Sequence, residues 1–185
     1  MESKAILYHS NTSKECKKFI DDKKYLVISQ NEKDDIWLGR GMYFWDNYGN
    51  AKWWNEKQYK RNPEEKYEIV RANVNMEKML DLTDYEVYVT MEHIWQEICV
   101  KLGIEGDIPL GNKLNIMMDY KFKTAYSVIK VIGKYNNTKA YGLFKFDYRS
   151  RKAEPTMTAK CIYNVRKSEC IIETEYVNDG GKHND

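Results

Sequence analysis

The chain has 185 residues, 42% of them hydrophobic and 31% charged, which suits one globular domain and excludes a disordered chain. Its formal net charge is only +2, with acids and bases interspersed, so composition gives no argument for general attraction to nucleic acid or membranes. Four scattered cysteines without CxxC spacing and three scattered histidines argue against a zinc cluster, and we expect no metal. Without a signal-peptide pattern or a membrane-length apolar run, we expect a cytoplasmic protein with reduced thiols and no membrane partner.

The N-terminal segment predicts a strand followed by a helix. Ala5–Tyr8 reads as a short strand that ends at His9. Thr12-Ser-Lys-Glu15 has the form of a capping box, in which a hydroxyl and a carboxylate satisfy the free amides of a helix start. Apolar residues follow at helical spacing, so we expect an amphipathic helix over residues 12–23.

An aromatic strand, a helix and an alternating strand are expected next. Ile36–Trp45 contains two glycines around Arg40, directly before a run of aromatic residues that reads as a strand. Asn50–Trp54 opens a helix whose two tryptophans, Trp53 and Trp54, are expected to pack against the sheet. Glu68–Val74 alternates, which places Val70, Ala72 and Val74 on one face of a strand.

The middle of the chain reads as helical. Tyr88, Met91, Trp95, Ile98 and Leu102 recur at helical spacing and predict a core-facing stripe, and Gly103 is placed to end that helix. A second helix is expected around Leu110–Met118 and a third over residues 124–132.

The C-terminal part returns to strands. Residues 141–148 alternate, and Lys160–Val165 and Glu169–Glu175 read as two further strands, expected to pair with each other as neighbours. Strands at both ends with helices between them predict an α+β fold. We expect one domain over residues 1–177 and a flexible tail over residues 178–185.

Five segments carry a family resemblance through their order and spacing. They are Tyr8-His9-Ser10, Trp37–Phe44, Asn50–Trp54, Met79–Thr83 and Tyr163–Ile171. Together they resemble the ADP-ribosyltransferase-like group, in the branch with a His–Tyr active site that includes diphtheria-type toxins and poly-ADP-ribose polymerases. The resemblance covers about half of the chain, and it implies split β-sheets with helices between them and NAD as the substrate.

The resemblance gives roles to three residues. It implies that His9 bonds the adenosine ribose of NAD, that Tyr43 stacks on nicotinamide, and that the backbone at Ser10 holds the nicotinamide amide, where family members usually have a glycine. Without the resemblance, His9 reads as a polar residue satisfied by backbone, and Tyr43 as a core aromatic.

The turn before the aromatic strand completes the expected NAD site. Gly39, Arg40 and Gly41 are assigned to it. Arg40 reads either as a solvated loop residue or as a bidentate partner of the NAD pyrophosphate, because a guanidinium matches phosphate oxygens. Since the second glycine leads into a strand, this turn is not a Rossmann phosphate loop.

The third motif of the family departs from its usual form. Active members often place a glutamate at the start of a late strand, where it holds a ribose hydroxyl. Here the aligned position is Lys160 or Ile162, while Glu154 and Glu169 lie before and after that strand. This departure argues against polymerase activity.

Three functional hypotheses follow. The first is a mono-ADP-ribosyltransferase that modifies a protein or nucleic-acid acceptor, as a bacterial or phage toxin or defence effector with an antitoxin as a possible partner. The second is a catalytically inactive NAD-binding or protein-interaction module of the same fold. The third is an α+β domain whose aromatic residues only fill a core.

Overall fold

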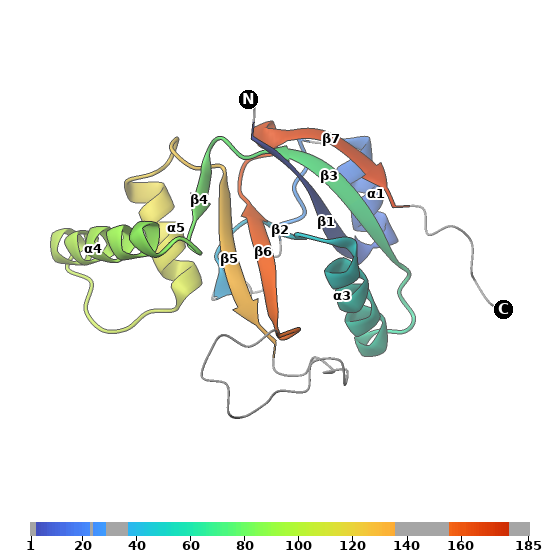
Figure 1. The fold of residues 1–185 in the computed structure, drawn as a ribbon, viewed down its shortest axis with the longest axis horizontal. Helices are drawn as coiled ribbons and strands as arrows, with labels where there is room; N and C mark the ends of the chain where they lie inside the picture. The colour runs from blue at the N-terminus through green and yellow to red at the C-terminus, as the bar shows by residue number, and fades with distance from the viewer. Residues whose placement is uncertain (1–2, 23, 29–36, 136–155, 178–185) are drawn as a thin grey trace.

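Seven strands form one hydrogen-bonded sheet in the order β4-β5-β6-β2-β1-β3-β7 (Figure 1). The computed structural model describes residues 3–22, 24–28, 37–135 and 156–177. β4 and β5 are parallel, and every other neighbouring pair is antiparallel. The strands are β1 (Lys4–Thr12), β2 (Met42–Trp45), β3 (Tyr67–Asn75), β4 (Met79–Asp81), β5 (Val128–Lys134), β6 (Ala159–Val165) and β7 (Ile171–Tyr176).

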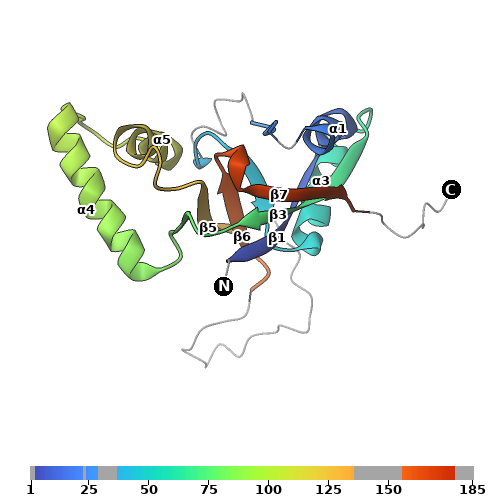
Figure 2. The ribbon, with the colours of Figure 1, turned by 90° about the horizontal axis from the view of Figure 1, so that it is seen from above.

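Helices cover both faces and one end of this sheet. They are α1 (Ser13–Asp21), α3 (Tyr48–Arg61), α4 (Tyr85–Leu102), α5 (Leu110–Tyr120) and the short 3-10 helix η2 (Ser168–Cys170). α1 lies behind β1 and β3, and α3 lies in front of them (Figure 1). α4 and α5 lie together beyond β4 and β5, at the opposite end of the sheet from β7 (Figure 2).

The alternation of strand side chains divides the core into two clusters. The cluster under α1 joins Phe19 to Phe44 of β2 and to Val70 and Val74 of β3, all fully buried. The cluster on the other face includes Trp45 of β2 together with buried residues of α3, α4, α5, β5 and β6. Neighbouring residues of β2 therefore serve opposite clusters, and the predicted inward face of β3 is confirmed.

The helix boundaries follow from capping. Thr12 caps α1 by accepting a hydrogen bond from the Glu15 amide at 3.4 Å. Only half of the capping box forms, because the Thr12 amide bonds Asn11 at 2.8 Å and Glu15 turns to Lys18. α3 begins earlier than predicted, where Asn47 caps the Asn50 amide.

α4 confirms the predicted stop at Gly103, which adopts the left-handed conformation with φ of 63°. The centre of its predicted stripe is buried, with Met91, Trp95 and Ile98 at 8%, 7% and 1% exposure. The ends of the stripe are exposed, with Tyr88 at 54% and Leu102 at 46%.

Two predictions are wrong. Residues 124–132 are not a helix: Val128–Lys134 forms β5, in which β-branched residues pair with β4 and β6 on both sides. The last two strands are not neighbours, because β6 pairs with β2 and β5 while β7 pairs with β3 at the sheet edge. β2 and β5 occupy both hydrogen-bonding edges of β6, so no edge is left for β7.

The α+β prediction is confirmed as a mixed fold with helices around one open sheet. The predicted strand over residues 141–148 and the predicted tail over residues 178–185 lie outside the described residues. No helix among the described residues is long and apolar enough to span a membrane.

Candidate functional site

A cavity of about 890 Å³ lies where β1, β2, β5 and β6 meet α3. Its lining is His9, Ser10, Asn11, Val27, Trp37, Tyr43, Trp45, Trp54, Gln58, Pro109, Leu110, Gly133, Lys134, Tyr135 and Ile162. The size and the mainly aromatic and aliphatic walls with a few polar groups are typical of small-molecule sites, which span roughly 300–1,000 Å³. His9 and Tyr43, the two residues to which the resemblance gives side-chain roles, both line this cavity.

The cavity lies beside the short pairing between strands β1 and β2. β1 and β2 share a single register pair, Tyr8 with Trp45, whereas β1 pairs with β3 along nine residues from Lys4 to Thr12. The continuous sheet therefore consists of two halves, β4-β5-β6-β2 and β1-β3-β7, which meet at one pair. His9 follows this pair on β1 and Tyr43 lies near it on β2, so the topology brings the two predicted residues together.

His9 is 7% exposed and bridges the two halves of the sheet. Its Nδ1 lies 2.6 Å from the Tyr43 carbonyl oxygen, and its Nε2 lies 3.4 Å from the side-chain amide nitrogen of Asn11. Burial lowers the pKa of His9 to about 4, although the bond to Tyr43 acts in the opposite direction. The ring is therefore neutral near pH 7. Nδ1–H donates to the carbonyl, and Nε2 is an acceptor.

Tyr43 is half-buried, and its ring orientation is fixed at both ends. Its hydroxyl donates to the Gly39 carbonyl at 2.6 Å, and its ring centroid lies 5.4 Å from that of Trp37 at an angle of 36°. Both rings line the cavity. A fixed aromatic surface in a cavity wall suits stacking on a planar ligand, because little side-chain entropy is lost on binding.

Ser10 faces α3 and is 3% exposed. Its hydroxyl donates to Gln58 at 2.8 Å and accepts from Asn55 at 3.1 Å. Ser10 and Gln58 both line the cavity, so this pair adds a polar edge to a mainly apolar wall. The structure places Ser10, which was predicted as a site residue, in the same cavity wall as His9 and Tyr43.

Three aromatic rings surround the indole of Trp45. Trp53, Trp54 and Tyr135 have ring centroids 5.7 to 6.1 Å from that of Trp45, and Trp53 lies 5.1 Å from Tyr135. The prediction that Trp53 and Trp54 pack α3 against the sheet is confirmed. Trp54 also lines the cavity.

The two glycines of the turn are required by packing. At Gly41, with φ of 153°, a Cβ would lie 1.6 Å from the Asn164 amide oxygen. At Gly39, with φ of 75°, a Cβ would lie 2.4 Å from the Asn115 amide oxygen. Asn164 is fully buried and donates to the Leu38 carbonyl at 2.9 Å. The glycines thus let the turn close over two asparagines, and neither glycine lines the large cavity.

Arg40 is not part of the large cavity. Its guanidinium bonds Asp119 of α5, and together with Gly41 it lines a second cavity of about 290 Å³. The predicted NAD-site residues are therefore divided between two places. His9, Ser10 and Tyr43 lie together, whereas Arg40 and Gly41 line the second cavity and Gly39 lines neither of the two.

Of the two residues at the expected glutamate position, Ile162 lines the large cavity and Lys160 does not. Lys160 lines a neighbouring cavity of about 680 Å³, with its ammonium 4.7 Å from the Trp53 ring centroid and 3.0 Å from the Asn50 side-chain oxygen. Burial lowers the pKa of Lys160. Glu169 is exposed on η2, and Glu154 lies outside the described residues. No carboxylate is found among the described residues that line the large cavity.

Several lining residues were not predicted as site residues. Asn11 and Gln58 supply polar groups, and Tyr135 supplies a ring. Trp54 and Gln58 lie four residues apart on α3, which places them on one helix face, but nothing in the sequence indicates which strand that face meets.

The chain matches no protein-family model, no curated protein and no solved structure. Among the described residues there is no group of three or more His, Cys, Asp or Glu side chains that could hold a metal ion. The functional argument therefore depends on the site itself.

Proposed function

We propose that the large cavity binds NAD and that the protein is a mono-ADP-ribosyltransferase of the ADP-ribosyltransferase-like fold. The observation that carries this proposal is that His9 and Tyr43, predicted as a pair from separate strands, line one cavity of about 890 Å³. The division of the sheet into two halves at the pair of Tyr8 and Trp45 supports the same fold proposal.

The protonation state of His9 supports a role in holding a ribose. A neutral imidazole with its Nδ1–H committed to the Tyr43 carbonyl leaves Nε2 as an acceptor, and a ribose hydroxyl is a donor that can replace the Asn11 side-chain amide, whose nitrogen lies 3.4 Å from Nε2. The Tyr43 and Trp37 rings supply an apolar surface on which nicotinamide can stack.

In the proposed reaction the bond between nicotinamide and ribose breaks, and its electron pair leaves on nicotinamide. The nucleophilic atom of the acceptor forms the new bond to the ribose carbon and loses its proton. Because the ribose carbon becomes positively charged, the site must fix the ring and hold it against the acceptor. The acceptor under this proposal is a protein or nucleic acid, and a toxin or defence role follows the resemblance.

A specific observation favours a second candidate function. Neither Lys160 nor Ile162, the two residues aligned with the glutamate of the resembled family, is a carboxylate, and the described residues that line the cavity include none. A site without that charge stabilises the developing positive charge less well. The second candidate is therefore a module that binds NAD without cleaving it.

The test uses purified protein, NAD labelled in its adenylate part and a bacterial lysate. We expect nicotinamide release and transfer of label to a macromolecule, with NAD affinity about tenfold lower in Tyr43→Ala, because stacking on the ring is lost. Tyr43→Phe is the matched control, since it keeps the ring and removes only the hydroxyl bond to Gly39.

Each outcome separates the candidates. Release of nicotinamide with only free ADP-ribose would indicate a hydrolase. Binding without release, across protein and nucleic-acid acceptors, would establish the binding module. Absence of NAD binding, or equal affinity in the wild type and Tyr43→Ala, would refute the proposed site.

A further inference from the structure

The second cavity combines positive charge with aromatic rings. It has a volume of about 290 Å³ and lies between α5, the turn before β2 and the end of β6. None of its residues lines the large cavity. The lining is Ile28, Arg40, Gly41, Met118, Asp119, Phe122, Lys123, Tyr126, Arg166 and Lys167.

Four of these side chains are cations and one is a carboxylate, so the wall is positively charged. Arg40 comes from the turn before β2, Lys123 follows α5, and Arg166 and Lys167 follow β6. Asp119 is the single acidic residue among the described lining residues, and it bonds Arg40. Cations from three separate segments thus converge on one small cavity, in a chain whose formal net charge is only +2. A concave surface of one sign concentrates counter-ions and charged ligands.

The two guanidinium groups are held in place by α5. Arg166 donates from both terminal nitrogens to the Asn115 oxygen, at 3.1 Å each, and the same oxygen accepts the Arg40 backbone amide at 2.9 Å. Asp119, one helical turn after Asn115, bonds the Arg40 side chain. Fixed guanidinium groups lose little entropy on binding, and their planar donors match phosphate oxygens.

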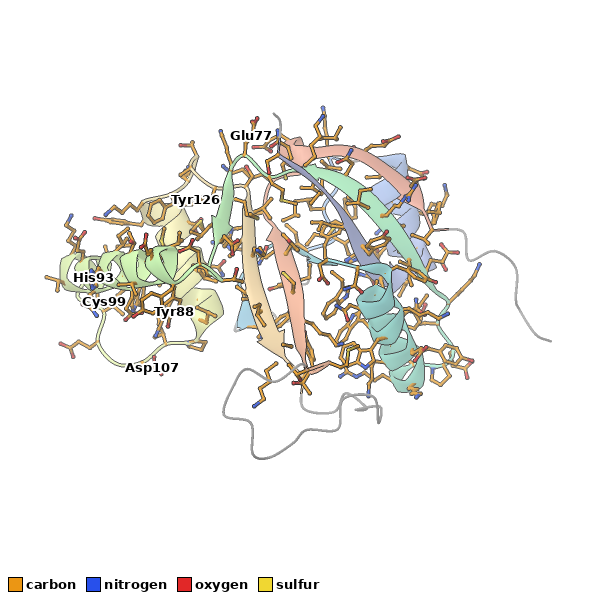
Figure 3. All side chains as sticks on the ribbon, in the orientation of Figure 1. Glu77, Tyr88, His93, Cys99, Asp107 and Tyr126 are labelled. Carbon is orange, nitrogen blue, oxygen red and sulfur yellow. The ribbon has the colours of Figure 1, made fainter. Side chains whose placement is uncertain are left out.

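Two aromatic rings complete the wall. Phe122 and Tyr126 have ring centroids 5.3 Å apart at an angle of 57°, and both line the cavity. Tyr126 lies between α5 and the start of β5 in the chain and is labelled in Figure 3. Because every nucleobase has a flat face that stacks on aromatic rings, such rings beside cations are typical of sites for nucleotides.

We infer that this second cavity binds a phosphate group carried by a nucleotide, with Arg40, Arg166 and Lys167 around the phosphate and Phe122 and Tyr126 against the base. The nucleotide is either free in solution or part of a nucleic-acid strand. The inference does not depend on NAD binding in the large cavity, because it uses different residues.

The test measures binding of inorganic phosphate, adenosine monophosphate and a short single-stranded oligonucleotide by calorimetry at low ionic strength. We expect binding by the wild type and a loss of affinity of about tenfold in Arg166→Met. Arg71→Met is the matched control, since it removes the same charge from β3, where Arg71 bonds Glu175 at 2.5 Å and lines neither cavity. Lys134→Met removes a cation of the large cavity and should leave phosphate binding unchanged.

Lys167→Met keeps the proposal testable if Arg166→Met fails to fold, because Lys167 is one of the cations placed around the phosphate and no described hydrogen bond depends on its side chain; we expect a similar loss of affinity. Tighter binding of the oligonucleotide than of adenosine monophosphate, with a steeper dependence on salt, would identify a nucleic-acid strand as the ligand. Equal affinities would identify a free nucleotide. The inference is overturned if no probe binds, if Arg166→Met and Arg71→Met lose affinity equally, or if Lys134→Met alone abolishes binding.

Discussion

Protonation of His9 should weaken the fold at acidic pH. Burial lowers the pKa of His9 from 6.5 to about 4, so the unfolded chain binds a proton in this pH range that the folded protein does not. Stability from the neutral ring is therefore fully present above pH 6.5 and is lost as the pH falls towards about 4. Since one pKa unit corresponds to about 1.4 kcal/mol, the free energy of unfolding should fall by roughly 2 kcal/mol between about pH 7 and about pH 4.5.

The assay is urea unfolding across this pH range, with the wild type compared with His9→Asn. The difference in unfolding free energy between the two proteins should shrink as the pH falls, because the variant has no ring to protonate. A change of roughly 2 kcal/mol moves the urea midpoint by about 1 M. His93→Asn is the control for loss of a histidine at an exposed position on α4 (Figure 3). A constant difference between the wild type and His9→Asn would refute the reasoning, since burial would then not set the charge of the ring.

Two further predictions concern packing. Gly41→Ala should lower the free energy of unfolding by about 3 kcal/mol or more in chemical unfolding, since its Cβ would meet the Asn164 oxygen. Gly103→Ala, at φ of 63° with no atom within 4 Å, should cost about 1 to 2 kcal/mol, and equal losses would contradict the packing argument. Cys16, whose pKa burial raises to about 12, should stay unlabelled by iodoacetamide in the folded protein, while half-buried Cys99 reacts. Labelling of Cys16 at the rate of Cys99, measured by mass spectrometry, would show that the core cluster under α1 opens.

A neutral His9 also sets the pH range of the proposed activity. Protonation at Nε2 would turn its acceptor into a donor and remove the bond proposed for the ribose hydroxyl. Because the pKa is about 4, this change falls well below neutral pH. The proposed NAD site is therefore compatible with physiological pH without a charged histidine.

The site was partly predictable because two of its segments carry local patterns. His9 follows an apolar run that predicts a strand, although β1 continues past the predicted end at His9 to Thr12, and Tyr43 lies in an aromatic strand that follows two glycines. The sequence did not predict that β1 pairs with β2, nor that the Arg40 side chain turns away from the large cavity towards Asp119. The side chain of Arg40 follows the turn set by positive φ at Gly39 and Gly41, and Asp119 of α5 bonds its guanidinium group.

The sequence by itself determined the elements whose causes are local. Capping at Thr12, the left-handed stop at Gly103 and the alternation over β3 each depend on residues within a few positions of one another. Only the tertiary structure decided that Val128–Lys134 is a strand and that β6 lies between β2 and β5. Strand pairing joins backbone groups far apart in the chain, so its energy depends on which edges remain available once the rest of the sheet has formed.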